Sequence, residues 1–153
     1  VDEVVQVDED AIALAILRLA ELEKGVVEGA GAAPLAGFLA GKLPFLKGKR
    51  VALLLCGGNI DPMVLSRVIE HGVAVDGRLA QFNAVISDRP GGLAELASTI
   101  AGTGASIQQI EHERAFADAD VSRVTVRCRV EVRDAGHLAS LKAALAAKGI
   151  RVD

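Results

Sequence analysis

A strict alternation of apolar and polar side chains near the C-terminal end constrains the fold more than any other feature of the sequence. The apolar positions lie two residues apart: Val124, Val126, Cys128, Val130 and Val132. The residues between them are charged or carry a hydroxyl group. Because successive side chains of a β-strand point to opposite faces, this pattern predicts a strand with one buried face and one open face.

The segments around this strand predict the rest of a small sheet domain. Alternating side chains predict a strand over residues 79–86, and Asp134 and Gly149 bound a helix with leucines on one side. The other expected elements are a helix after the turn at residues 88–92, strands over 106–116 and 150–153, and a β-bulge near 107–110. This β-α-β-β-α-β order predicts a four-stranded antiparallel sheet with both helices on one face, the ferredoxin-like arrangement.

The first half of the chain is predicted to be mostly helical. Asp8 is a suitable N-cap for a helix that ends at Gly25. Pro34 suits the first turn of a second helix, because its missing N–H would be unpaired there anyway. Asp61 is expected to cap a third helix, which Gly72 ends.

One strand is predicted between these helices. Residues 51–56 are apolar throughout, a pattern typical of a strand buried on both faces in a parallel sheet. The Asp76-Gly77-Arg78 segment marks a change in periodicity. We therefore expect two domains, at residues 1–77 and 78–153.

Composition excludes several kinds of partner. The 153 residues are 51% hydrophobic and carry a net charge of −3, so nucleic acid is not an expected partner. Cys56 and Cys128 match no disulfide or zinc spacing, which indicates a reducing cytoplasm and no metal site. Charges and glycines interrupt the apolar runs, so neither a membrane span nor a signal peptide is expected.

Two charged clusters have alternative interpretations. The run Glu111-His112-Glu113 contains metal-ligating types, but neighbouring strand residues point to opposite faces, so a solvated strand is favoured. Four arginines between residues 123 and 133 are expected to form a solvated or subunit-facing surface. An anion or nucleic-acid site is the less favoured alternative, because no aromatic stacking residues lie nearby. His71 and His137 are expected at the surface near helix ends.

The turn Asp88-Arg89-Pro90-Gly91-Gly92-Leu93, in this topology, resembles the D-x-P-G-x-L turn of the ACT domain. The resemblance implies an amino-acid effector bound by these residues. Gly91 and Gly92 let a ligand approach the backbone, and the helix start offers N–H groups to a carboxylate. ACT domains bind effectors across domain pairs, so a homodimer or higher homo-oligomer is also implied.

Two segments of the first half resemble the pyridoxal-phosphate-dependent threonine and serine ammonia-lyases, which have a tryptophan-synthase-like fold. Cys56-Gly57-Gly58-Asn59 is similar to the end of the last strand of that catalytic domain, where a Ser or Cys bonds the pyridine nitrogen of the cofactor. Val27-Glu28-Gly29-Ala30-Gly31-Ala32 resembles the V-E-G-A-G-A segment that lines the cofactor pocket. The resemblance implies pocket roles for Cys56, Gly57, Gly58, Glu28 and Gly29. The alternatives are a small buried residue for Cys56, and a local cap or salt-bridge partner for Glu28.

The layout as a whole resembles the C-terminal portion of a threonine dehydratase: a remnant of the catalytic domain followed by an ACT regulatory domain. The intact enzyme would convert L-threonine to 2-oxobutanoate and ammonia. No segment here matches the family's S-x-K-x-R-G-like lysine region or its glycine-rich phosphate loop, so we expect this chain alone to be inactive and to bind no cofactor. The alternative is a stand-alone amino-acid-binding regulatory module, or an oligomerisation module.

Overall fold

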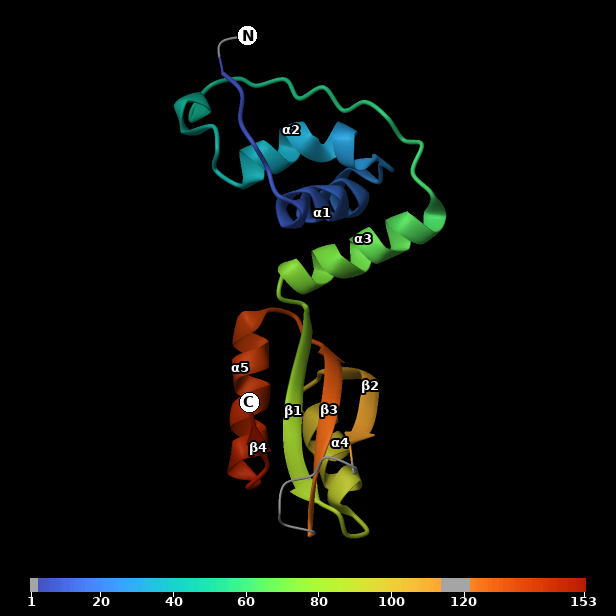
Figure 1. The fold of residues 1–153 in the computed structure, drawn as a ribbon. Coiled ribbons are helices and arrows are strands. Elements are labelled where there is room, and N and C mark those ends of the chain that lie inside the picture. The colour runs from blue at the N-terminus through green and yellow to red at the C-terminus, as the bar shows by residue number, and fades with distance from the viewer. Residues whose placement is uncertain (1–2, 114–121) are drawn as a thin grey trace. The chain divides into compact units, whose positions relative to one another are not determined.

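The computed structural model describes residues 3–113 and 122–153. The chain forms two compact units, Val1–Asp76 and Gly77–Asp153. The division falls within the Asp76-Gly77-Arg78 segment where the sequence periodicity changes. Helices and strands of each unit can be followed in Figure 1. None of the helices in the described ranges is long and apolar enough to cross a membrane.

The second unit is a four-stranded antiparallel sheet with two helices, as predicted. Its elements are β1 (Leu79–Ser87), α4 (Gly92–Gly102), β2 (Ser106–Glu113), β3 (Arg123–Glu131), α5 (Ala135–Ala147) and β4 (Arg151–Val152). The strand order is β2-β3-β1-β4, and every neighbouring pair is antiparallel. The part of the expected 106–116 strand beyond residue 113 lies outside the described residues.

The alternation along β3 determines where the core of this unit lies. The apolar residues of β3 are at most 2% exposed and belong to one cluster with Leu96 of α4 and Leu141 of α5. Both helices therefore cover the same face of the sheet. Burial raises the pKa of the Cys128 thiol to about 11, so this cysteine stays protonated at neutral pH. The predicted bulge is confirmed, because the register of β2 on β3 shifts between Ile107 and Gln109.

The start of α5 confirms one prediction and overturns another. Asp134 caps the helix as predicted, its Oδ1 accepting a hydrogen bond from the His137 N–H at 2.8 Å. The prediction that His137 lies at the surface is wrong, because the residue is only 6% exposed. Its Nδ1 accepts from the Arg133 N–H at 3.1 Å, and its Nε2 lies 2.9 Å from the Thr103 carbonyl oxygen. The imidazole therefore joins the end of α4 to the start of α5, a contact that local sequence patterns do not reveal.

The described part of the first unit is helical. It contains α1 (Glu9–Arg18), the π-helical segment η1 (Leu19–Glu23), α2 (Gly29–Leu39), the 3-10 turn η2 (Pro44–Leu46) and α3 (Pro62–Val75). Both predicted N-caps are confirmed. Asp8 Oδ1 accepts from the Ala11 N–H at 2.8 Å, and Asp61 Oδ1 accepts from the Met63 N–H at 2.8 Å.

Two helix boundaries differ from the prediction. The helix α2 begins at Gly29, so Pro34 lies inside it rather than in its first turn and removes one helical hydrogen bond. Gly72 does not end α3, which continues to Val75. A Cβ on Gly72 would lie 2.8 Å from the Ala13 carbonyl oxygen, so the glycine permits close packing of α3 on α1.

The predicted parallel strand over residues 51–56 is wrong for this structure. Residues 51–61 have no regular secondary structure, and Leu54 is 78% exposed. A parallel strand needs neighbouring strands for its backbone N–H and C=O groups, and the described residues of the first unit provide none. The core of this unit is instead a small cluster of helix residues: Ala15, Ile16, Leu19, Ala32 and Ala36.

Candidate functional site

The turn between β1 and α4 has two glycines for which other residues would be poor substitutes. Gly91 has a φ of 100°, in the left-handed region that L side chains rarely adopt. A Cβ on Gly92 would lie 2.2 Å from the Ser87 carbonyl oxygen. The Asp88 N–H donates to the Ser122 carbonyl oxygen at 3.0 Å. The turn is therefore held close to the end of β1 and to the residue that precedes β3.

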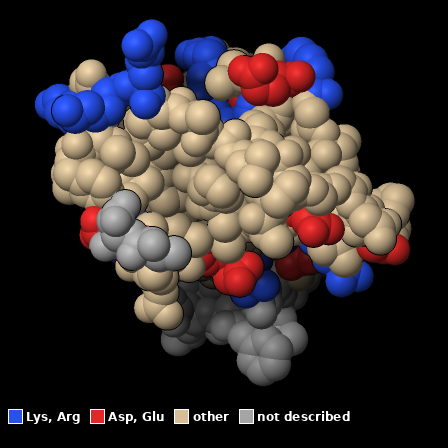
Figure 2. Space-filling view, turned by 90° about the horizontal axis from the view of Figure 1, so that it is seen from above, with Lys and Arg blue, Asp and Glu red and all other residues tan. Residues whose placement is uncertain are grey.

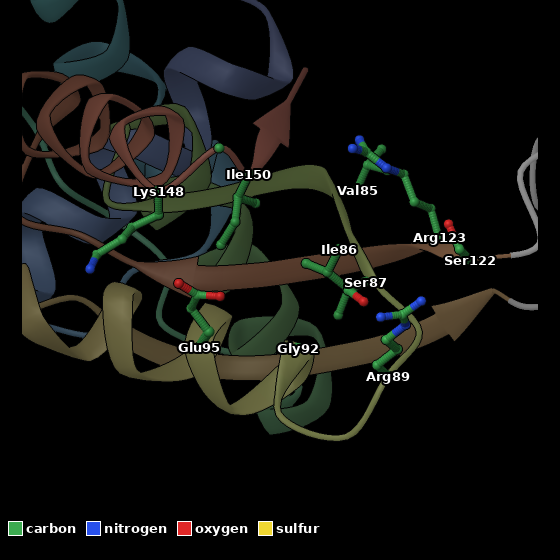
Figure 3. A pocket seen from close by; sticks show the side chains of 11 residues that line it. Val85, Ile86, Ser87, Arg89, Gly92, Glu95, Ser122, Arg123, Lys148 and Ile150 are labelled. Atoms are coloured by element: carbon green, nitrogen blue, oxygen red, sulfur yellow. The ribbon is translucent and has the colours of Figure 1, made fainter.

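A pocket of about 320 Å³ opens beside this turn (Figure 3). Its apolar wall includes Ile86 of β1 and Ile150 before β4, which are 4% and 6% exposed. The charged side chains Arg89, Glu95 and Lys148 also line it. The remaining lining residues are Val85, Ser87, Gly92, Ser122, Arg123 and Gly149. The pocket thus joins the first strand and helix of this unit to the corner between α5 and β4.

The structure assembles only some of the predicted effector-binding residues around this pocket. Arg89 and Gly92 line it. The other four predicted residues (Asp88, Pro90, Gly91 and Leu93) lie in the turn or the first turn of α4, and are not among the lining residues. They shape the turn rather than form the wall.

Sequence reasoning missed the pocket residues Glu95 and Lys148. Glu95 lies three positions after Gly92, so helical spacing from the glycine turn could have indicated it. Lys148 is the C-cap of α5 and reaches the pocket only because β4 pairs beside β1. No local sequence signal connects Lys148 to the turn.

The two segments predicted to line a cofactor pocket contact each other in the first unit. The Glu28 N–H donates to the Gly57 carbonyl oxygen at 3.0 Å. Gly57 has a φ of 83°, and a Cβ there would lie 2.4 Å from Glu28 Oε1. A Cβ on Gly31 would lie 1.9 Å from the Cys56 carbonyl oxygen. Glycine is therefore needed on both sides of this contact.

The other residues of this predicted pocket lie in the same two segments. Gly29 begins α2, and a Cβ on Gly58 would lie 3.1 Å from the Val26 carbonyl oxygen. Cys56 is exposed as a free thiol, and Glu28 is half-buried. The two segments thus lie side by side, with the Glu28 carboxylate beside Gly57 and the exposed Cys56 next to it in the chain.

The open face of the sheet carries the predicted arginine stripe. Arg127 and Arg129 border a hollow of about 220 Å³ together with Gln81, Gln109 and Glu111. Glu111 Oε2 lies 3.7 Å from Arg127 Nη1 across β2 and β3. The stripe is therefore partly neutralised, which agrees with the interpretation as a solvated face. Within residues 3–113 and 122–153, no group of three or more His, Cys, Asp or Glu side chains could hold a metal ion.

Large apolar side chains are exposed mainly on the first unit. Of the thirteen such residues in the described chain, all but Leu93 belong to residues 1–76. Figure 2 shows one face of the molecule on which uncharged residues occupy the centre and charged side chains lie towards the margins.

The first unit also contains a hollow of about 340 Å³ between α1 and α3. Its lining includes Ile12, Ile16, Val64 and Val68.

Similarity to curated proteins covers the whole chain. This chain is 41% identical over 153 residues to an L-threonine ammonia-lyase of Geobacter sulfurreducens. It is 39% identical over 152 residues to an L-threonine ammonia-lyase of Thermotoga maritima. These matches cover 100% and 99% of this chain, but only 38% and 37% of the relatives. A catabolic L-threonine dehydratase of Staphylococcus aureus is 44% identical over 77 residues, which are 49% of this chain and 22% of that protein. No family model matches the sequence.

Among solved structures, the ACT domain of a GTP pyrophosphokinase from Chlorobium tepidum aligns with 49% of this chain and 94% of its own, at 19% identity and a TM-score of 0.38. The sheet topology defines the second unit as a ferredoxin-like α/β unit, which follows a helical segment. The whole chain is homologous to the C-terminal part of the L-threonine ammonia-lyases, and it spans little more than a third of their length.

Proposed function

We propose that this chain is the regulatory C-terminal part of an L-threonine ammonia-lyase, in which residues 77–153 are an ACT domain that binds an amino-acid effector. The observation that carries the proposal is the pocket of about 320 Å³ beside the glycine turn at residues 88–92. Its volume is at the lower end of the range for small-molecule sites, which suits a free amino acid. Full-length similarity to L-threonine ammonia-lyases supports the choice of enzyme family.

Residues 1–76 contribute to the catalytic domain of the intact enzyme in this proposal. Residues 27–32 and 56–59 would form one wall of a pyridoxal-phosphate pocket, and the Cys56 thiol would hydrogen-bond the pyridine nitrogen of the cofactor. Bound pyridoxal phosphate supplies an electron sink for the elimination reaction that converts L-threonine to 2-oxobutanoate and ammonia. A thiol does not hold the pyridine nitrogen protonated as a carboxylate would. Glu28 supports this wall through its backbone bond to Gly57.

The isolated chain is expected to be inactive, because its sequence contains no match to the lysine segment or the phosphate-binding loop of the family. The test is to incubate the pure chain with L-threonine and added pyridoxal phosphate, and to follow 2-oxobutanoate. Sustained turnover would contradict this part of the proposal and leave the effector-binding part intact.

Effector binding is tested by thermal melts of the chain with L-isoleucine, L-valine, L-threonine and L-serine. Far-UV circular dichroism is the suitable signal, since the chain has no Trp or Tyr. A ligand that binds only the folded state stabilises it by about 2.7 kcal/mol at a hundredfold excess over its Kd. We expect a saturable rise in the midpoint with one or more of these amino acids.

A matched pair of glycine variants locates the binding. Gly92→Ala places a Cβ 2.2 Å from the Ser87 carbonyl oxygen, whereas Gly102→Ala, at the other end of α4, meets nothing within 4 Å. The ligand-induced shift should be lost in the Gly92 variant and retained in the Gly102 variant. If no amino acid shifts the midpoint of the unaltered chain, the effector proposal fails.

A further inference from the structure

We infer that the pocket beside the β1–α4 turn binds its amino acid as a zwitterion, with the Glu95 carboxylate facing the ammonium group and the Arg89 guanidinium facing the carboxylate. The inference rests on the proposed effector function. It adds the two side chains that recognise the charged groups of an amino acid, of which Glu95 distinguishes an amino acid from other small carboxylic acids. The glycine turn alone does not predict these roles, because a turn offers only backbone groups.

Arg89 and Glu95 reach the pocket from different positions. Arg89 lies in the turn before α4, and Glu95 lies in the first turn of that helix. In Figure 3 the Arg89 guanidinium lies on the side of Ser87, and the Glu95 carboxylate points towards Ile150. Opposite charges therefore occupy separate parts of one pocket. A free amino acid carries opposite charges on two adjacent groups, so it can satisfy both parts at once.

Two apolar side chains and two glycines line the same pocket as these charges. Ile86 and Ile150 are almost completely buried and line the pocket from β1 and from the segment before β4. Gly92 and Gly149 also line the pocket and have no side chain to fill it. The pocket therefore has room for a small ligand whose charged groups face Arg89 and Glu95, and the mostly buried isoleucines offer its carbon atoms only a small apolar contact.

The charge balance of the wall restricts the ligand further. Among the lining residues in the part of the chain that the structure describes, Arg89, Arg123 and Lys148 are cationic and Glu95 is anionic. Lys148 approaches from the end of α5 and Arg123 from the start of β3. A ligand with a positively charged side chain would add to this excess, so L-lysine and L-arginine are expected to bind much more weakly than neutral amino acids.

The experiment measures binding of L-isoleucine, L-valine, L-threonine and L-serine to the whole chain by calorimetry, each beside its 2-hydroxy acid and its carboxamide. The hydroxy acid lacks the ammonium group, and the carboxamide lacks the carboxylate. The variants are Glu95→Gln and Arg89→Gln. Matched controls are Glu111→Gln and Arg151→Gln, which remove the same charges outside this pocket. Unliganded melting midpoints show that each variant folds, and Glu95→Ala provides a second variant at the main position.

The unaltered chain should prefer the amino acid over its hydroxy acid by about tenfold or more, the effect of one charge-assisted hydrogen bond. In Glu95→Gln and Glu95→Ala this preference should fall to near one, and in Arg89→Gln the preference over the carboxamide should fall similarly. Both controls should keep the preferences of the unaltered chain. Amino-acid binding with an undiminished preference in the Glu95 variants would overturn this inference alone. Absence of amino-acid binding to the unaltered chain would overturn the proposed function as well.

Discussion

The two units are almost equal in length but differ in how far they cover their apolar surface. In the second unit, fourteen buried residues form one cluster across the sheet and both helices. In the first unit the corresponding cluster has five residues, mostly alanine. Twelve of the thirteen large exposed apolar residues of the described chain also belong to the first unit.

This difference shows that a similar hydrophobic content does not by itself give a separate core. The second unit pairs its strands with each other and buries one face of the sheet beneath its own helices. The first unit contains residues 51–56, an apolar run suited to a sheet interior, but its described residues form no strand with which this run could pair. Its surface therefore fits a segment of a larger domain, which agrees with the proposed role in the catalytic domain of a longer enzyme.

The largest effect that tests this comparison is expected in the core of the second unit. Leu141→Ala removes a fully buried side chain and should lower the free energy of unfolding by about 2–5 kcal/mol. Leu54→Ala, at a position that is 78% exposed in the first unit, should change it by no more than about 0.5 kcal/mol. Urea denaturation followed by circular dichroism measures both. Equal losses would show that Leu54 is buried in solution and that the contrast between the units is wrong.

The next effect concerns the contact between two segments of the first unit, residues 27–32 and 56–59. Gly31→Ala places a Cβ 1.9 Å from the Cys56 carbonyl oxygen and should destabilise the first unit by about 1–3 kcal/mol. The control is Gly25→Ala, where a Cβ meets nothing within 4 Å. Limited proteolysis and thermal melts should distinguish the two variants. A neutral Gly31→Ala variant would indicate that these segments separate in solution.

An effect of similar size is expected from the histidine that joins the two helices of the second unit. His137→Ala leaves the Thr103 carbonyl and the Arg133 N–H without this partner, which should cost about 1–3 kcal/mol. His71 provides the contrast in the first unit, since its side chain is 53% exposed and bonds the exposed Asp10. His71→Ala should be close to neutral in the same denaturation experiment. If both variants behave alike, the buried position of His137 is wrong.

The smallest effect is a pH dependence at Asp153. Its carboxylate accepts hydrogen bonds from the backbone N–H and the side-chain amide of Asn83, each at 2.7 Å, and these bonds lower the pKa of Asp153. A carboxyl group with a lowered pKa adds stability above its unfolded pKa, about 3.9, and loses that contribution as pH falls through the folded value. The unfolding midpoint should therefore exceed that of Asp153→Asn at neutral pH, and the gap should close on acidification. A gap that is unchanged at low pH would contradict this assignment.

The second unit could be predicted from sequence because its signals are local. Alternation along β3, the Asp134 cap and the irregular spacing near Ile107 each specify a backbone feature within a few residues. The paired strands then follow from the order of the elements. The four-stranded sheet and its bulge could therefore be predicted from the sequence.

The errors arise where a local pattern depends on a distant partner. The apolar run at residues 51–56 indicates a buried strand, but strand formation requires neighbours that the described first unit does not contain. Gly72 has the sequence signature of a helix end, yet its role is set by the Ala13 backbone on another helix. The burial of His137 was not predicted, because its partner Thr103 lies far from it in the chain. Lys148 was missed as a pocket residue, because Arg89, which lines the same pocket, is also distant in the chain.

The shortness of β4 has a consequence for local opening of the second unit. β4 pairs with β1 through two residues, whereas β3 is paired with β1 along its whole length and with β2 from Thr125 to Glu131. Local opening free energies follow the number of such bonds, so backbone amides at the α5–β4 corner should exchange with solvent far faster than those of β3. Gly149 and Ile150 at this corner also line the pocket. A bound ligand would therefore slow hydrogen exchange at the end of the domain, as well as contacting the glycine turn at its beginning.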